Sequence, residues 1–179
     1  MTNKIGLGGG CHWCTEGIFQ SLIGVEHVDQ GWIKSEGEND AFSEAVIVTY
    51  DPNEISLETL IEIHILTHSS TSEHSMRGKY RSAVYIFDEK QGEDTQMILD
   101  RLNTARKEKM ITQVLPFVDF KRNTEDLLNY YQTRPDAPFC KRYIEPKLRK
   151  LLETHGKQIN LNYSANKRST STFKSGSSL

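Results

Sequence analysis

Residues 8–16 read Gly-Gly-Gly-Cys-His-Trp-Cys-Thr-Glu, and a short apolar run precedes them. This pattern predicts a strand, a glycine turn and a helix over about residues 13–22. Glycines allow a tight turn and a close approach to a ligand, and the unpartnered first amides of a helix face whatever lies at its start. Cys11 is therefore expected to have a lowered thiol pKa and to act as a thiolate nucleophile. The alternative is a small, buried structural cysteine.

Length and composition limit the class of protein. The chain has 179 residues and a formal net charge of -2, with scattered basic residues. We expect one catalytic domain over residues 1–155 and a polar, disordered tail over residues 156–179. Neither nucleic-acid binding nor a membrane segment is predicted. With three cysteines and no apolar N-terminal region, we expect a cytoplasmic, monomeric protein with redox or catalytic thiols.

Hydrophobic periodicity and turn residues predict the order of elements. Strands are expected at 25–34, 42–50, 82–87 and 111–115, and helices at 13–22, 56–65, 88–108, 125–132 and 144–155. The polar segment 68–79 is expected to be a functional loop. This order predicts an α+β fold, a two-layer α/β sandwich with a ferredoxin-like βαββαβ core, in which helices pack on a mixed sheet.

Several side chains outside the glycine stretch could contribute to a site. Glu44 lies within a strand, where it faces either solvent or the Cys11 pocket; in the pocket, burial would raise its pKa and make it a proton donor at neutral pH. Tyr80 follows the polar loop, from which a phenol can reach the end of a sheet. Trp13 and Trp32 form either the wall of an apolar pocket or part of the core.

Two further side chains lie near Cys11 in the sequence. Adjacent helical residues point about 100° apart, so His12 is not expected to pair directly with the thiolate. Glu16 is expected to be a favourable charge in the first turn of the helix rather than a catalytic acid.

The other two cysteines are candidates for a resolving thiol. Cys140 is expected in an extended segment before the last helix, where mobile backbone would let it reach a sulfenic acid; otherwise it is an unpaired surface cysteine. Cys14 forms a Cys-x-x-Cys pair with Cys11, which is either redox-active or half of a zinc site. No paired histidine pattern supplies the two missing ligands, so no metal site is predicted.

Four stretches together resemble the A-type peptide methionine sulfoxide reductases. Residues 9–16 resemble the Gly-Cys-Phe-Trp signature of that family, and residues 43–52 resemble its Ala-Glu-Ala-Val strand, which places Glu44 on the catalytic glutamate. Residues 80–85 are similar to its Tyr-Arg-Ser-Ala-Ile-Tyr segment, which places Tyr80 on a sulfoxide-binding tyrosine. Residues 138–148 resemble the tail of members with a recycling cysteine, here Cys140. The resemblance covers about residues 4–152.

The chain also departs from the family pattern. His12 stands where the family has a phenylalanine, and Trp32 takes the place of a tyrosine that would donate to the sulfoxide oxygen. No aspartate can be placed in the segment before Tyr80, and Leu128-Asn129 replaces a His-Gln pair. The substrate pocket, with His12, Trp13 and Trp32 as its expected substrate-binding residues, is therefore altered.

The resemblance implies a mechanism. The Cys11 thiolate attacks the sulfur of a methyl sulfoxide, while protonated Glu44 and Tyr80 bind its oxygen and supply the proton. Cys11 becomes a sulfenic acid, and Cys140, or alternatively Cys14, closes a disulfide with it. Thioredoxin or another dithiol then restores the thiols, with no metal or organic cofactor. The family acts on the S epimer of methionine sulfoxide, free or in peptides, and Trp13 would pack against the substrate methyl.

Three other functions stay open on the sequence. The first is a general thiol–disulfide oxidoreductase that uses Cys11 and Cys14. The second is a non-catalytic redox sensor. The third is a reductase of a different methyl sulfoxide, which the changes at His12 and Trp32 would favour.

Overall fold

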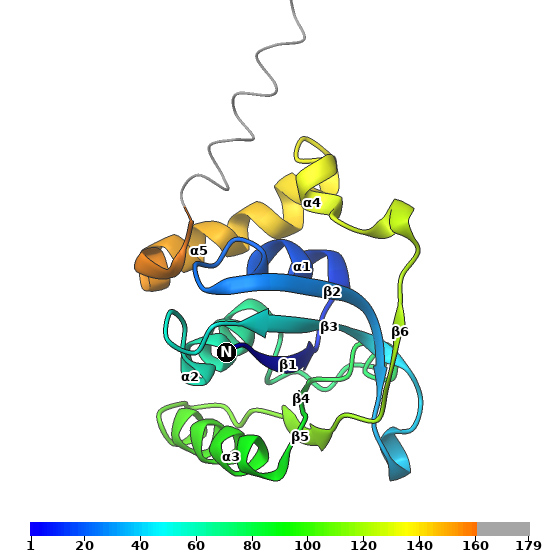
Figure 1. Cartoon of the computed structure of the whole chain (residues 1–179), viewed down its shortest axis with the longest axis vertical. Helices are drawn as coiled ribbons and strands as arrows, with labels where there is room; N and C mark the ends of the chain where they lie inside the picture. Colours follow the sequence, from blue (N-terminus) through cyan, green and yellow to red (C-terminus); the bar gives the residue numbers. More distant parts are fainter. Residues whose placement is uncertain (161–179) are drawn as a thin grey trace, which may run out of the picture.

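The computed structural model describes residues 1–160 (Figure 1). Its strands are β1 (Asn3–Gly8), β2 (Val25–Lys34), β3 (Ser43–Tyr50), β4 (Ala83–Ile86), β5 (Gln113–Pro116) and β6 (Asp119–Arg122). Its α-helices are α1 (His12–Phe19), α2 (Leu57–Thr67), α3 (Glu89–Thr104), α4 (Tyr130–Thr133) and α5 (Glu145–His155). A π-helical segment, Cys140–Ile144, leads directly into α5.

The six strands form one sheet in the order β5-β4-β1-β3-β2-β6. Within the four central strands, β4-β1-β3-β2, each adjacent pair is antiparallel; α1 connects β1 to β2, and α2 connects β3 to β4. That arrangement is the βαββαβ core. The edge strand β5 runs parallel to β4, and β6 runs antiparallel to β2. The predicted α+β fold with a mixed sheet is confirmed.

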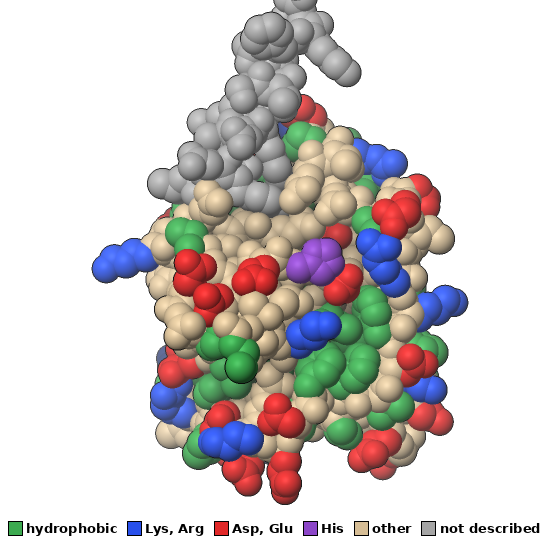
Figure 2. Space-filling view, viewed as in Figure 1, with side chains coloured by type: hydrophobic (Ala, Val, Ile, Leu, Met, Phe, Trp, Pro, Cys, Tyr) green, Lys and Arg blue, Asp and Glu red, His purple; other side chains and the backbone are tan. Residues whose placement is uncertain are grey.

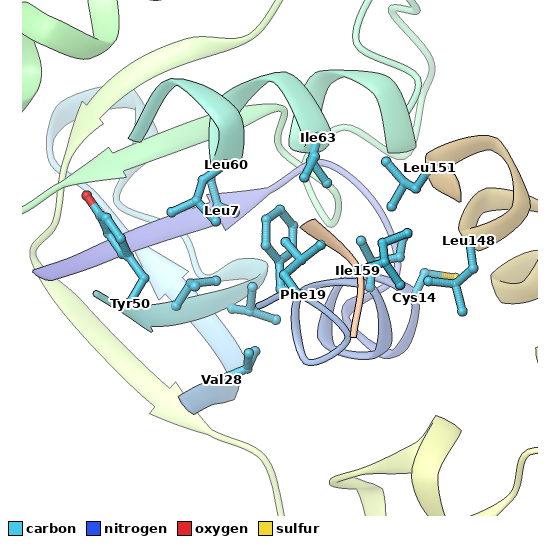
Figure 3. Packing of buried hydrophobic residues seen from close by; sticks show 14 of the residues in the cluster. Leu7, Cys14, Phe19, Val28, Tyr50, Leu60, Ile63, Leu148, Leu151 and Ile159 are labelled. Atoms are coloured by element: carbon cyan, nitrogen blue, oxygen red, sulfur yellow. The ribbon is translucent and has the colours of Figure 1, made fainter. Parts of the chain in front are cut away.

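The main core lies between one face of the sheet and three helices (Figure 3). Strand alternation sends Leu7 and Val46 to this face, where Phe19 from α1, Leu60 from α2 and Leu151 from α5 pack, all 0% exposed. The helix α3 is attached farther out, through a separate cluster that it shares with α2. Helices therefore cover this face of the sheet, and α1 carries the glycine-turn cysteine into it.

The opposite face of the sheet has its own smaller cluster. Its buried members are Ile33, Ala45, Ile47, Ala83 and Tyr85, and they are covered by Leu115, Phe117 and Phe120 from the segments of the edge strands. Figure 2 shows a patch of hydrophobic side chains over the region of β5 and β6, with acidic and basic side chains interspersed around it.

Two predicted elements differ from the structure. The edge strand β6 was not expected, because only one of its four side chains is even half-buried and pairing with β2 rather than a hydrophobic pattern defines it. The predicted helix over 125–132 is broken into a 3₁₀ turn (Glu125–Leu127) and the four-residue α4. Asn129 has a φ of 53°, in the left-handed region, and this interrupts the helix.

The first five residues of the predicted tail, 156–160, pack on the domain. They form a 3₁₀ turn (Gly156–Gln158), after which Ile159 pairs with Leu22 in an isolated β-bridge and is only 5% exposed. The rest of the predicted disordered tail, 161–179, lies outside the described residues and stays a prediction. Within residues 1–160, no helix combines the length and apolar character needed to cross a bilayer.

Replacing Ile159 with alanine tests this attachment. We expect the variant to lose about 2–4 kcal/mol in the free energy of unfolding, because truncating a buried isoleucine leaves a cavity. Urea denaturation at neutral pH measures the loss. Met97→Ala on α3, where the side chain is 62% exposed, is the control and should change stability by less than about 0.5 kcal/mol. Equal effects in the two variants would show that residues 156–160 are not held on the domain.

Candidate active site

Cys11 lies at the end of the turn between β1 and α1, where it is the half-buried N-cap residue of the helix. The side chain of Cys14 donates a hydrogen bond to its sulfur, and so does the backbone amide of Trp13. Together with the nearby His12, these contacts outweigh burial and lower the pKa of Cys11 to about 6. At neutral pH the sulfur is therefore mostly a thiolate, as the glycine turn and helix start predict.

A pair of stacked histidines, buried His64 and half-buried His68, supports the glycine turn. Gly9 has a φ of 145°, and a Cβ at this position would lie 2.4 Å from the ring of His68. That ring stacks on His64 at 4.2 Å, its Nδ1 lies 2.6 Å from the His64 carbonyl oxygen, and its Nε2 lies 2.7 Å from the Ser82 hydroxyl. This contact between the polar loop and the turn could not be predicted from sequence patterns, because Gly9 and His68 lie 59 positions apart.

Glu44 is 4% exposed and lies beside the turn, since Gly8 of β1 is paired with Ala45 of β3. Its Oε2 accepts a hydrogen bond from the backbone amide of His12 at 3.1 Å and lies 3.0 Å from His12 Nδ1. The ring N–H is not aligned with this oxygen, so the second contact is electrostatic. The Oε1 atom lies 3.3 Å from Lys79 Nζ.

These contacts reverse the expected titration of Glu44. Burial acts to raise the pKa of its carboxyl, but the contacts with His12 and Lys79 outweigh burial, and the pKa is lowered below its usual value. Of the two orientations left open by the sequence, Glu44 takes the buried one, but the raised pKa expected for a buried Glu44 is wrong. Glu44 is ionised at neutral pH, and its negative charge reaches Cys11, where it opposes the lowering of the thiol pKa.

Asn123 determines which ring nitrogen of His12 carries the proton. Its Oδ1 accepts a hydrogen bond from Trp32 Nε1 at 3.1 Å, and an indole N–H can only donate. Its Nδ2 must therefore face His12 Nε2, at 3.1 Å, and Gln30 Oε1, at 2.6 Å. Because His12 Nε2 accepts, the ring proton is on Nδ1, on the side of Glu44. Asn123 was not predicted from the sequence, because it lies 111 positions from His12.

Glu16 is not the favourable first-turn charge that was expected, because it lies beyond the first turn of α1 and is buried. It is 1% exposed, and its carboxylate accepts hydrogen bonds from Gln30 Nε2 at 2.8 Å and from the backbone amides of Asn129 at 3.0 Å and Tyr130 at 3.4 Å. Burial is the largest influence on its carboxyl, whose pKa is raised. Glu16 therefore fixes the turn that places Tyr130.

Trp13 belongs to an aromatic cluster beside Cys11. Its ring stacks on Tyr130, with centroids 4.2 Å apart and planes 10° apart, and meets Phe139 edge-on at 5.5 Å. The ring of Trp32 lies edge-on to the ring of His12, with centroids 5.8 Å apart. Neither Tyr130 nor Phe139 was identified from the sequence, since the broken helix at Asn129 is what brings Tyr130 to Trp13.

Tyr80 and Cys11 line one cavity of about 490 Å³, together with Gly9, Gly10 and His68. The backbone around Tyr80 is fixed to β3: the Lys79 carbonyl accepts from the Glu44 amide at 2.8 Å and from the Ser43 hydroxyl at 2.9 Å. The Lys79 ammonium lies 5.1 Å from the centre of the Tyr80 ring. Lys79, which was not predicted from the sequence, thus lies between Glu44 and Tyr80.

All three cysteines are thiols, and the two candidates for a resolving thiol are buried. Cys14 is 4% exposed, and its hydrogen bond to Cys11, followed by burial, raises its pKa well above the usual value. Cys140 is 0% exposed in the π-helical segment, and its Sγ donates to the Arg134 carbonyl at 3.2 Å.

The expectation of an extended, mobile segment at Cys140 is wrong, because Cys140 and Ile144 are packed in the main core. Cys140 lies close enough to Cys14 to raise its pKa. Within residues 1–160, no cluster of three His, Cys, Asp or Glu side chains is arranged to hold a metal ion.

Comparisons with known proteins agree on one family. A family model described as peptide methionine sulfoxide reductase matches residues 3–160. Peptide methionine sulfoxide reductase MsrA of Trichodesmium erythraeum is 31% identical over 175 residues, covering 89% of this chain and 99% of the relative.

Solved structures share the fold. Mxr1 from Saccharomyces cerevisiae in its reduced form gives a TM-score of 0.70 at 20% identity, covering 78% of this chain and 89% of that one. Mxr1 in complex with Trx2 gives a TM-score of 0.58 at 20% identity, covering 70% and 83%.

Replacing Cys14 with alanine tests the electrostatics of Cys11. Because the Cys14 hydrogen bond is the largest influence that lowers it, the pKa of Cys11 should rise from about 6 toward the ordinary thiol value. The pH dependence of iodoacetamide labelling at Cys11, in a Cys140→Ala background, measures this pKa. An unchanged labelling profile would mean that the helix start alone activates the thiol.

The lowered pKa of His68 predicts a loss of folding stability in acid. Burial is the main cause that lowers the pKa of His68 from 6.5 to about 4. As pH falls from about 6.5 to about 4, His68 binds a proton in the unfolded chain but stays neutral in the folded chain. The folded state therefore loses stability over this pH window. His68→Gln should remove on the order of 2 kcal/mol of this pH dependence in urea unfolding. Exposed His27→Gln, the control, should leave the pH dependence unchanged.

Proposed function

The chain belongs to the peptide methionine sulfoxide reductase family, and we propose that Cys11, Lys79 and Tyr80, with Glu44 as the anchor of Lys79, carry its chemistry. The enzyme reduces methionine sulfoxide with thiols. The observation that carries these assignments is a cysteine with a lowered pKa, in the same cavity as Tyr80 and beside the Glu44–Lys79 pair. We propose the S epimer as its substrate, free or in peptides.

The first step transfers oxygen from substrate to enzyme. The Cys11 thiolate attacks the sulfoxide sulfur, the S–O bond of the substrate breaks, and the oxygen takes up one proton. Cys11 is oxidised to a sulfenic acid, and the substrate leaves as methionine. Trp13, held by Tyr130 and Phe139, would pack against the substrate methyl group.

The proton needs a donor other than Glu44, because a carboxyl with a lowered pKa is ionised at neutral pH. We assign proton donation to Lys79, whose ammonium Glu44 holds at 3.3 Å, with a second hydrogen bond from the Tyr80 hydroxyl. A positive charge aimed at the sulfoxide oxygen stabilises the negative charge that develops there. The Lys79 side chain is 45% exposed, so it can regain its proton from solvent.

Lys79→Gln tests this assignment. We expect the variant to lower kcat/KM for methionine S-sulfoxide about 10- to 100-fold at pH 7, because an oriented charge is removed from the developing oxyanion. The acid limb of the pH–rate profile should stay near the pKa of the Cys11 thiol, about 6, because Lys79 is not among the groups that set this pKa. Lys4→Gln, at the far end of β1, is the control. Unchanged kinetics in Lys79→Gln would mean that a protonated Glu44, and not Lys79, donates the proton.

The sulfenic acid is resolved by a second thiol, and we propose Cys14 for this role. Its side chain already contacts the Cys11 sulfur, whereas Cys140 is fully buried and close to Cys14. Attack by Cys14 on the sulfenic sulfur forms a disulfide and releases water. Cys140 is then placed to exchange into that disulfide.

A single-turnover assay without external thiol distinguishes the two resolving thiols. Wild type should form about one methionine per chain and lose two thiols. Cys14→Ser should still form methionine but keep Cys11 as a sulfenic acid that dimedone traps, while Cys140→Ser should behave as wild type. If only Cys140→Ser accumulates the sulfenic acid, Cys140 is the resolving thiol.

We propose thioredoxin or a similar dithiol as the reductant, with no prosthetic group. The support is the fold shared with Mxr1, which has been solved in complex with Trx2. The family match also favours this function over general thiol–disulfide exchange and over a redox sensor.

A further inference from the structure

The cavity at Cys11 continues into a second depression. The two share Leu66, His68, Ser69 and Lys150 in their linings. The first extends from Cys11 and Tyr80 to Lys147 and Lys150 on α5, and the second extends from Lys150 to Arg106 and Lys107 after α3. Together they form one groove, which we call the basic groove.

The charge of the basic groove is uncompensated. Lys147, Lys150, Arg106 and Lys107 line it, whereas its only acidic lining residue is Glu108. Among residues 1–160, none of these four cations has a carboxylate within ion-pair distance. By contrast, Lys90, Arg101, Lys141 and Arg149 elsewhere on the surface all have one.

A fifth cation, Arg77, lies beside the wall of the groove. Its guanidinium donates to the backbone carbonyls of Gly9, Ser69, Ser72 and Tyr80, and so it holds the polar loop on the glycine turn without neutralising its charge. The combined field reaches the buried groups: Lys147 and Arg106 both help to lower the pKa of His68. The groove is therefore positive along its whole length, beginning at the nucleophile.

We propose that the basic groove binds an acidic stretch of the oxidised polypeptide substrate, so that methionine sulfoxide flanked by aspartate or glutamate is the preferred substrate. This inference rests on the proposed function. The sulfoxide itself is neutral, so its binding does not require the positive charges of Lys147 and Lys150. Carboxylates on the flanking residues would complement the cations and speed encounter.

The position of the groove favours the substrate over the reductant as its occupant. Its lining includes Cys11, which meets the sulfoxide, but neither Cys14 nor Cys140. After the exchange proposed above, the disulfide that the reductant must reduce joins Cys14 and Cys140, and both residues are buried in the main core.

The test is single-turnover reduction, without external reductant, of peptides that contain methionine S-sulfoxide. The flanking residues are Glu, Ser or Lys, placed on either the N- or the C-terminal side. Each rate is divided by the rate of the same protein on free methionine S-sulfoxide. We expect the Glu peptide to react about three- to tenfold faster than the Ser peptide at low salt, and the ratio to fall as salt is added.

Charge reversal provides the matched comparison. The double variant Lys107→Glu, Lys150→Glu should favour the Lys peptide over the Glu peptide, whereas Lys4→Glu, an exposed lysine at the far end of β1, should keep the wild-type preference. Circular dichroism and the iodoacetamide profile of Cys11 check that the double variant is folded.

The outcomes separate this inference from the proposed function. If the enzyme reduces free methionine sulfoxide and reduces the Glu, Ser and Lys peptides at equal rates, the acidic-substrate inference alone is overturned. No reduction of any sulfoxide would contradict the proposed function. A charge effect that appears only with a thioredoxin-type reductant under multiple turnover would assign the groove to the reductant, which also overturns the inference.

Discussion

The carboxylate of Glu44 is the group on which the arrangement of the site depends. It is buried in β3, and an isolated buried charge is too costly to persist without partners. The backbone amide of His12, the His12 ring and the Lys79 ammonium supply them. These partners come from two parts of the site, His12 and Lys79, so satisfying one charge ties the start of α1 and the segment before Tyr80 to the central sheet.

A chain of buried polar contacts extends this constraint away from the nucleophile. From Glu44 it passes through His12 to Asn123, then to Gln30 and finally to Glu16, which holds the amides of Asn129 and Tyr130. The chain joins α1, β2 and the segment after β6. Because a half-satisfied buried network is worse than an apolar core, the position of Tyr130 against Trp13 depends on the same contacts as the charge of Glu44.

The sequence predicted what local patterns determine. The glycine turn, Cys11 at the helix start and the βαββαβ order follow from periodicity and turn residues, and all are present. The pKa expected for a buried Glu44 had the wrong sign, because the contacts of its carboxylate with His12 and Lys79 join residues far apart in the sequence. Cys140 was misplaced for a similar reason, since a Pro-containing stretch suggested extended chain whereas core packing makes it helical.

His12 and Trp32, the two side chains that depart from the family pattern, are connected through hydrogen bonds of Asn123. An imidazole buried at position 12 needs a donor for Nε2, and Asn123 supplies it only if its amide is turned so that the oxygen faces away from His12. That oxygen then needs a donor of its own, which the indole of Trp32 provides. The Trp32 N–H is thereby used within the protein and is not available to a sulfoxide oxygen. This leaves Tyr80, which lines the cavity with Cys11, and Lys79, which contacts Glu44, as the groups that we propose as donors to the substrate.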